Sequence, residues 1–321
     1  MRLWRIVLCS WLVCLVAPVQ AQESWPQRQV TILVPYTAGG TADVFARILA
    51  THMQAKFGQP FVVENRSGAG GSTGTIVAAR APADGYTVLV GSASSHVINQ
   101  LIYKRLTLDT EQSFAPVSLI AHLPNVLAVH PRVPAKTAAE LLAYLKANPD
   151  KLSFGSSGVG TSSHLSGELL KLKTGTRMTH VPFKSANEST QSLAGGHVDV
   201  AFDNMSMLWP LAQNGLVRPL AVSTMERNPA APDLPSFAET LPGFEVTAWF
   251  GMFVPAGTPR PVLDTLAAET KRILDLPDVR KQMLDTGAIP APMSPDQFAE
   301  FIKAERVRWK ETVTAAGISL D

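Results

Sequence analysis

The chain has 321 residues, and its 28 Lys and Arg side chains nearly balance its 26 Asp and Glu side chains. This length suits about two domains and a core that needs no disulfide or metal for stability. The near-neutral charge argues against a nucleic-acid-binding protein, which would show a basic excess, and 46% apolar residues argue against disorder.

The first 21 residues have the pattern of a cleavable export signal. Arg2 and Arg5 form a basic start, residues 6–16 are almost wholly apolar, and residues 19–21 (Val-Gln-Ala) form a small-x-small cleavage site. The apolar run is shorter than the roughly 20 residues that a membrane-spanning helix needs. We therefore expect a mature chain that begins at Gln22 and lies in the periplasm, with an uncleaved anchor as the alternative.

Both cysteines, Cys9 and Cys14, lie inside this predicted signal. A mature chain without thiols excludes disulfides, thiolate metal sites and a cysteine nucleophile. The seven histidines show neither an HExxH motif nor paired spacing, so we expect no metal site. The glycine-rich loop 65–72 completes neither a P-loop nor a dinucleotide-binding motif, and we expect no cofactor.

Short β-branched runs alternate with helical patterns from Val30 onward. This alternation predicts βαβ units and mainly parallel sheets covered on both faces. The first predicted elements are strand 30–34, helix 42–56, strand 61–64, helix 73–81 and strand 87–90. The alternation restarts with strand 126–129, helix 138–147, strand 152–154, helix 162–173, strand 178–181, helix 188–194 and strands 198–202 and 217–222.

Residues 220–235 are rich in proline and small side chains, which suits a crossover. A strand is predicted at 246–254, followed by helices at 261–275, 277–285 and 295–315. Two α/β lobes fit this order best, and a third small subdomain is the alternative. We expect residues 22–124 and 225–321 to form one lobe, residues 125–224 to form the other, and a ligand cleft to lie between them.

Two similar strand-to-helix turns lie 120 positions apart, at Ala38-Gly39-Gly40-Thr41 and at Gly158-Val159-Gly160-Thr161. Glycine lets the backbone approach a ligand, threonine caps helices, and the first amides of a helix favour an anion. Ligands in open α/β sheets bind beyond the carboxyl ends of strands, where such turns lie. Each turn alone could be an ordinary connection, but the pair predicts anion binding, which a side chain at either Gly40 or Gly160 should weaken.

Several other polar residues near predicted strand ends have two readings. Asp43 either stabilises its helix dipole or holds a water or a ligand ammonium, and His164 either supports its loop or contacts the ligand. Lys184 is a surface charge or a counter-ion at the cleft. Ser72 lies in a GxSxG motif but follows seven loop residues, whereas a nucleophile elbow has its serine directly at the turn. An exported serine hydrolase is therefore the weaker alternative.

Six segments together carry a specific family resemblance: 34–43 (VPYTAGGTAD), 64–71 (ENRSGAGG), 83–87 (ADGYT), 158–165 (GVGTSSHL), 180–184 (HVPFK) and 195–199 (GGHVD). The chain resembles the Bug family, the periplasmic solute-binding receptors of tripartite tricarboxylate transporters, over nearly the whole mature sequence. It departs from the family pattern at Ser185 and Gln100, where glycine and proline are usual. The first departure bears on specificity more than on fold.

The resemblance implies a two-lobed Venus-flytrap fold in which each lobe is a mainly parallel sheet flanked by helices. A small carboxylate would be held between loops 36–43 and 156–164 by backbone amides and bridging waters, then delivered to a membrane permease without bond chemistry. The expected ligand-binding residues are Tyr36, Thr37, Ala38, Gly39, Gly40, Asp43, Ser92, Ser157, Thr161, Ser162, Ser163, His164, Phe183 and Asp203.

The ligand itself is left open by the sequence. Mono-, di- and tricarboxylates, aromatic acids and acidic amino acids all suit the same helix ends, and Asp43 favours a ligand with one carboxylate or an amino group. We expect a monomer with no catalytic residue and no nucleic-acid partner. A ligand-sensing input for a membrane signalling partner is a further alternative to transport.

Overall fold

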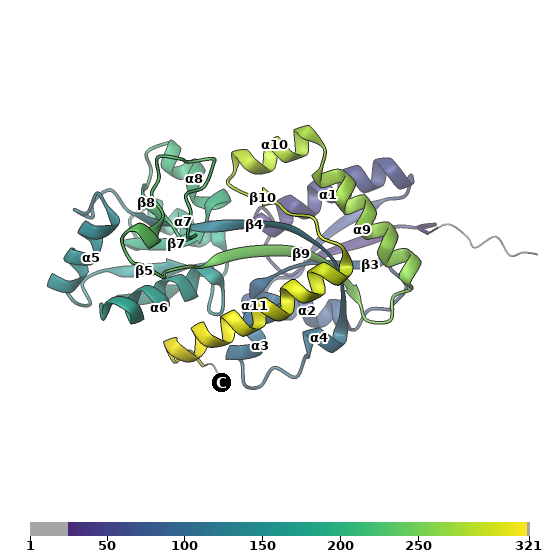
Figure 1. The fold of residues 1–321 in the computed structure, drawn as a ribbon, viewed down its shortest axis with the longest axis horizontal. Coiled ribbons are helices and arrows are strands. Elements are labelled where there is room, and N and C mark those ends of the chain that lie inside the picture. Colours follow the sequence, from purple (N-terminus) through teal and green to yellow (C-terminus); the bar gives the residue numbers. More distant parts are fainter. Residues whose placement is uncertain (1–24, 320–321) are drawn as a thin grey trace, which may run out of the picture.

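The computed structural model describes residues 25–319, so the predicted export signal lies outside the described residues (Figure 1). Ten strands form one sheet in the described part of the chain. Eight of them follow the order β2-β1-β3-β9-β4-β7-β5-β6, and β10 and β8 lie off this path, each paired to β4. The strands are β1 (Val30–Val34), β2 (Phe61–Asn65), β3 (Thr87–Ser92), β4 (Phe114–Val129), β5 (Ser153–Ser156), β6 (Thr179–Pro182), β7 (Val200–Asn204), β8 (Arg218–Val222), β9 (Thr247–Pro255) and β10 (Ile289–Pro290).

Helices cover this sheet on both sides. They are α1 (Thr41–Phe57), α2 (Ser72–Ala79), α3 (Asn99–Ile102), α4 (Thr110–Ser113), α5 (Ala138–Ala147), α6 (Ser162–Thr174), α7 (Ala186–Ala194), α8 (Met205–Gln213), α9 (Arg260–Leu274), α10 (Pro277–Asp285) and α11 (Pro295–Ala316), with a π-helical turn at Ser94–Ile98. None of the helices in residues 25–319 is long and apolar enough to cross a membrane.

The molecule has two lobes, which lie side by side and are joined by β4 and β9 (Figure 1). One lobe contains the parallel trio β2-β1-β3, and the other contains the parallel trio β6-β5-β7. Antiparallel pairs connect β3 to β9, β9 to β4 and β4 to β7. The expected parallel βαβ units are therefore present, and the long crossing strands make the complete sheet mixed.

Strand β4 is far longer than the predicted strand 126–129. Pro116 and Pro124 interrupt its sequence, and proline cannot donate a ladder hydrogen bond. The pairing with β9 shifts register between Pro116 and Ser118 and again after Leu119, which accommodates the irregular pattern. β4 pairs with β9 up to Pro124 and with β7 from Asn125 onward, so a single strand serves both lobes.

Ser223 ties together two segments that cross between the lobes. The Asn125 N–H donates to Ser223 Oγ at 2.8 Å, and the Ser223 N–H donates to the Asn125 carbonyl at 2.8 Å. Ser223 Oγ in turn donates to the Val246 carbonyl at 2.5 Å, and the Val246 N–H returns a bond to Ser223 O at 2.9 Å. The lobe boundaries at 124/125 and 224/225 stay predictions.

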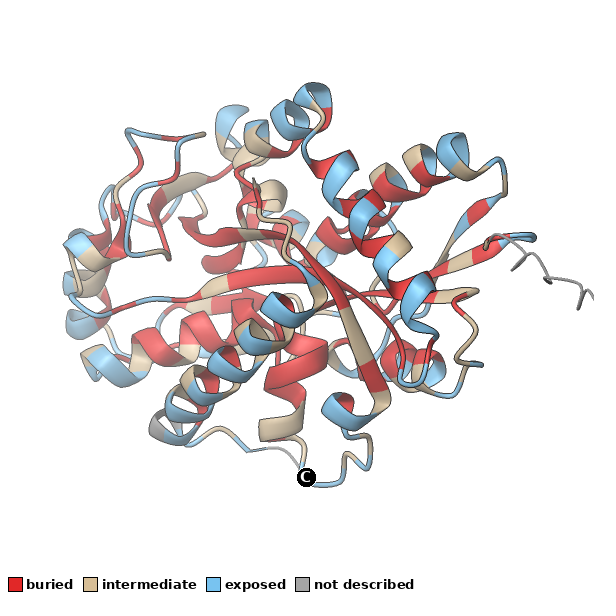
Figure 2. Ribbon diagram, turned by 45° about the vertical axis from the view of Figure 1, so that its right-hand side comes forward, coloured by how far each residue is buried: buried red, intermediate tan, exposed pale blue. Residues whose placement is uncertain are grey.

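Buried residues follow the strands and the inward faces of the helices that cover them (Figure 2). One apolar cluster lies between α1, α9 and the sheet, and another lies beneath α7 and α8. The C-terminal helix α11 packs on β4, α3 and α9, and it also contacts α6 in the other lobe. These packed layers fix the strand ends from which the site loops emerge.

Candidate functional site

A cavity of about 510 Å³ lies between the lobes, where loops from both halves meet. The loops that follow β1, β2 and β3 line it from one side, and those that follow β5, β6 and β7 line it from the other. All six loops leave the carboxyl ends of strands, where ligands bind in open α/β sheets. Among the described residues that line it there is no Asp or Glu, and Lys184 is the one charged side chain.

Five helices begin at this cavity. The N-cap residues of α1, α2, α6, α7 and α8 all line it, and they are Gly40, Gly71, Thr161, Ser185 and Asn204. The first amides of a helix lack internal partners and carry the positive end of the helix dipole. Several such ends around a space without acidic side chains create a positive potential that favours an anion.

Sequence reasoning identified only two of these helix ends, at α1 and α6. The α7 end was detectable, because Ser185 followed by Glu188 matches the capping pattern S-x-x-E. In the structure Ser185 Oγ accepts the Glu188 N–H at 3.1 Å. Asn204, which begins α8, lies two residues after the end of the predicted strand 198–202, and no helix is predicted from the sequence at residues 205–213.

Asp43 lies behind the α1 loop and does not line the cavity. Its carboxylate accepts the Gly39 N–H at 2.9 Å, two bonds from Arg47 at 2.8 and 3.0 Å, and one from Asn65 Nδ2 at 2.9 Å. Burial alone would raise the pKa of Asp43, but the bonds from Arg47, Gly39 and Asn65 lower it below its ordinary value. The acid therefore holds the loop in shape, and its contacts lie within the protein.

Tyr36 and Ser92 form a polar pair on the cavity wall. Their side-chain oxygens are 2.5 Å apart, and the Ser94 N–H donates to Ser92 Oγ at 3.2 Å. Burial raises the pKa of the Tyr36 hydroxyl above its ordinary value, so the group stays neutral at physiological pH. The wall thus offers neutral hydroxyls beside the amides of α1.

The α6 loop is ordered by its own hydroxyls. Thr161 Oγ1 donates to the Gly158 carbonyl at 2.6 Å and accepts the His164 N–H at 3.4 Å. Ser163 Oγ accepts the Ser157 N–H at 2.9 Å. These bonds leave the loop backbone curved around the cavity, with Ser157, Thr161 and Ser162 on its lining.

Side chains of the two lobes touch across the mouth of the cavity. Thr41 Oγ1 lies 2.8 Å from Ser206 Oγ and accepts a bond from Asn204 Nδ2 at 3.2 Å. Tyr103 Oη donates to the Val159 carbonyl at 3.4 Å. The structure therefore has the lobes in contact around the cavity.

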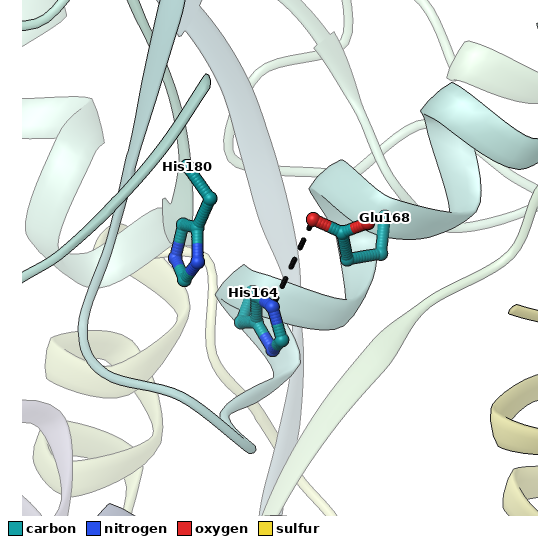
Figure 3. A group of neighbouring side chains, drawn as sticks. All are labelled: His164, Glu168 and His180. Atoms are coloured by element: carbon teal, nitrogen blue, oxygen red, sulfur yellow. Dashed lines mark ion pairs between the residues drawn. The ribbon is translucent and has the colours of Figure 1, made fainter. Parts of the chain in front are cut away.

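His164, Glu168 and His180 form a cluster behind the α6 loop (Figure 3). One possible ligand atom from each lies within 4.8 Å of the others. A metal ion fits this arrangement poorly, because Lys171 Nζ already contacts the two Glu168 oxygens at 2.8 and 2.9 Å. In addition, the two imidazole rings stack with centroids 4.3 Å apart and planes 23° apart, so their lone pairs do not converge.

The cavity brings together eight of the fourteen predicted binding residues: Tyr36, Thr37, Gly40, Ser92, Ser157, Thr161, Ser162 and Phe183. The other six do not line it, and they are Ala38, Gly39, Asp43, Ser163, His164 and Asp203. Asp203 is fully buried, burial raises its pKa to about 7, and its Oδ2 has no hydrogen-bond partner. Direct ligand contact by any of the fourteen stays a prediction.

The hydrolase reading receives no support from the position of Ser72. This serine does not line the cavity, and its Oγ accepts a bond from Asn99 Nδ2 at 2.9 Å. An elbow nucleophile would face the cavity beside a histidine base. Ser72 instead anchors Asn99 beneath the glycine-rich loop.

The sequence matches the family described as tripartite tricarboxylate transporter family receptor over residues 45–318. The chain belongs to this receptor family. It is similar to solved structures with matching folds, among them R. palustris Rpa4515 with adipate, which is 38% identical with a TM-score of 0.88 and covers 92% of this chain and 99% of its own.

Two further solved structures are similar to this receptor over most of its length. The periplasmic binding protein BugD is 34% identical with a TM-score of 0.87, over 92% of this chain and 99% of that one. MatC (Rpa3494) from Rhodopseudomonas palustris, with bound malate, is 34% identical with a TM-score of 0.84, over 90% of this chain and all of that one. The predicted family membership and the two-lobed fold are confirmed.

Proposed function

We propose that this receptor captures a small carboxylate in the cavity between its lobes and releases it unchanged. The observation that carries the proposal is the convergence of five helix N-termini on a cavity that no Asp or Glu among residues 25–319 lines. Backbone amides at these ends would bind the carboxylate oxygens, with neutral hydroxyls such as Ser92 and Ser157 and bridging waters completing the shell.

The relatives with adipate and with malate support a carboxylate ligand here. Part of the cavity wall is apolar, with Ala248 and Phe250 contributed by β9 and Phe183 by the loop after β6. This wall would contact the carbon skeleton of the ligand. Polar helix ends combined with an apolar wall suit mono- and dicarboxylates of aliphatic or aromatic acids. The binding experiment below distinguishes among these ligands.

We further propose export to the periplasm through the predicted signal and delivery of the ligand to membrane subunits of a tripartite tricarboxylate transporter. The family to which the chain belongs supports this partner. A signalling partner is the alternative recipient of the ligand-bound form. Co-purification from membranes, with and without bound acid, would separate the two.

The decisive measurement is thermal unfolding of the chain from Gln22 with succinate, malate, adipate, citrate, glutamate and benzoate. The protein is first unfolded and refolded to remove any ligand carried through purification. An acid at a hundredfold excess over its Kd stabilises the folded state by about 2.7 kcal/mol, which raises Tm by several degrees. No shift with any acid, for refolded protein with a native circular dichroism spectrum, would contradict the proposal.

A further inference from the structure

The α6 loop, residues 156–161, bends around the proposed carboxylate site and is held from behind by two histidines. Neither His164 nor His180 lines the cavity, so neither is placed to contact the ligand. Each histidine instead contacts the loop through one ring nitrogen, and the two contacts differ in which nitrogen they use.

His164 receives a bond from the loop backbone. The Gly160 N–H donates to His164 Nδ1 at 3.4 Å, which requires that Nδ1 carry no proton. The proton of the neutral ring then resides on Nε2, which lies 3.8 Å from Glu168 Oε1 (Figure 3). Lys171 contacts both Glu168 oxygens and so holds the Glu168 carboxylate near Nε2. The carboxylate in turn favours the His164 tautomer with the proton on Nε2.

His180 uses its other nitrogen. Its Nε2 lies 2.7 Å from Ser156 Oγ, and the same oxygen accepts the Gly158 N–H at 3.4 Å. The ring is sandwiched between Phe154, at a centroid distance of 4.6 Å, and His164, at 4.3 Å. Ser156 is fully buried, so this serine–histidine pair is closed to any substrate and supports the loop.

We propose that His164 and His180 are positioning residues: they hold the Gly158 and Gly160 N–H groups on the side away from the cavity and so fix the curvature of the loop that lines the ligand site. This inference rests on the proposed function, because it assigns the loop a ligand to face. Stacking of the rings fixes the positions of His164 Nδ1 and His180 Nε2. These nitrogens fix the conformation of the loop through their contacts with the Gly160 N–H and Ser156 Oγ.

Amide substitutions test this assignment, because asparagine and glutamine each mimic one imidazole nitrogen. The Asn side-chain oxygen can take the place of Nδ1, and the Gln side-chain amide can take the place of Nε2. His164→Asn and His180→Gln should therefore keep the loop contact, whereas His164→Gln and His180→Asn should lose it. All four variants lose ring stacking, so each pair is matched for that loss.

We expect His164→Gln to bind at least tenfold more weakly than His164→Asn, and His180→Asn at least tenfold more weakly than His180→Gln. Titration calorimetry would use succinate, malate or adipate, whichever raises the wild-type Tm most. All four variants should show similar decreases in Tm. Equal affinities within each pair would overturn the inference, since a purely structural role predicts the same loss for both members.

A readout that needs no ligand separates failure of this inference from failure of the proposed function. Amide hydrogen exchange at Gly160 should accelerate at least tenfold in His164→Gln and remain near the wild-type rate in His164→Asn. Nitrogen NMR of the unliganded wild type should detect the Nε2–H tautomer of His164. The opposite tautomer, or equal Gly160 amide exchange rates in the two variants, would overturn the inference even if a ligand binds. If the exchange rates differ as expected but no acid binds, only the proposed function is contradicted.

Discussion

Gly160 offers the sharpest test of how the lobes meet. It has a φ of +82°, and a Cβ built there would lie 2.6 Å from Ile102 Cδ1 and 2.7 Å from Asn99 Oδ1, both in the opposite lobe. Neither neighbour can move easily, because both are fully buried and Asn99 donates to the Gly70 carbonyl and to Ser72 Oγ. Gly160→Ala should therefore oppose the contact between the lobes.

The free-energy cost of Gly160→Ala has two parts. A left-handed backbone costs an alanine about 1–2 kcal/mol in any lobe arrangement, and overpacking costs a further 1–3 kcal/mol only while the lobes touch. The second part weakens ligand affinity by roughly 5- to 150-fold, because binding must then supply it. Gly175, at the other end of α6, has a φ of +64° and open space around its Cβ, so Gly175→Ala carries the backbone cost alone.

The two variants should lose similar amounts of thermal stability, and only Gly160→Ala should lose affinity. Calorimetry with the stabilising acid measures the affinity, and small-angle X-ray scattering with and without that acid measures compaction. Equal affinities for the two variants would refute the claim that the lobes meet at Gly160. Gly40 is a contrasting case: its φ is −80° and its Cβ would meet only the Thr37 carbonyl, at 3.4 Å. Contrary to the expectation from the sequence, which treated the two glycines alike, Gly40→Ala should therefore retain affinity.

Three further predictions concern charged and titratable groups. Asp43→Asn should lower the free energy of unfolding by about 1–3 kcal/mol, and denaturant unfolding measures the change. An amide keeps one accepting oxygen, for the bonds from Gly39 and Arg47 Nε, but its NH2 would then face the donors Arg47 Nη2 and Asn65 Nδ2. Lys184→Met should weaken binding less than about tenfold, because this exposed charge is screened by solvent, and the difference from wild type should shrink in 0.5 M salt. Burial lowers the pKa of His96 to about 3, so below pH 6.5 the unfolded state binds more protons than the folded state, and stability should fall as the pH drops from 6.5 toward 3. The decrease in Tm from pH 7 to pH 4.5 should be smaller in His96→Phe than in the wild type. An equal decrease in both proteins would contradict the assignment of this effect to His96.

Local patterns predicted most of the elements, because alternation of β-branched runs and helical periods reflects how each segment buries its own apolar face. The first half of β4 escaped prediction for the same reason. Its prolines at 116 and 124 and its polar His122 look unlike a buried strand, and the register shifts that accommodate them depend on β9, more than 120 residues later. Pairing over such a distance leaves no local signal.

The site divides in a similar way. The glycine and threonine turns at α1 and α6 were visible because their chemistry is local, and both turns line the cavity. The role of Asp43 was ambiguous in the sequence, since no local pattern indicates that Asn65 and Arg47 donate hydrogen bonds to its carboxylate. The cluster of His164 and His180 joins residues from a helix and a strand, so only the fold reveals that they share one stack.

The bonds that converge on Ser223 have a mechanical consequence. Since β4 passes from one lobe to the other within a continuous ladder, and Ser223 fastens it to the second crossing segment, a rotation of the lobes would bend these strands and leave the ladder and the Ser223 bonds in place. Heat should then melt both lobes in a single calorimetric transition. The elastic energy of that bend would set the angle between the lobes in the ligand-free protein. It would also set the part of the binding free energy that a bound acid must supply to change that angle.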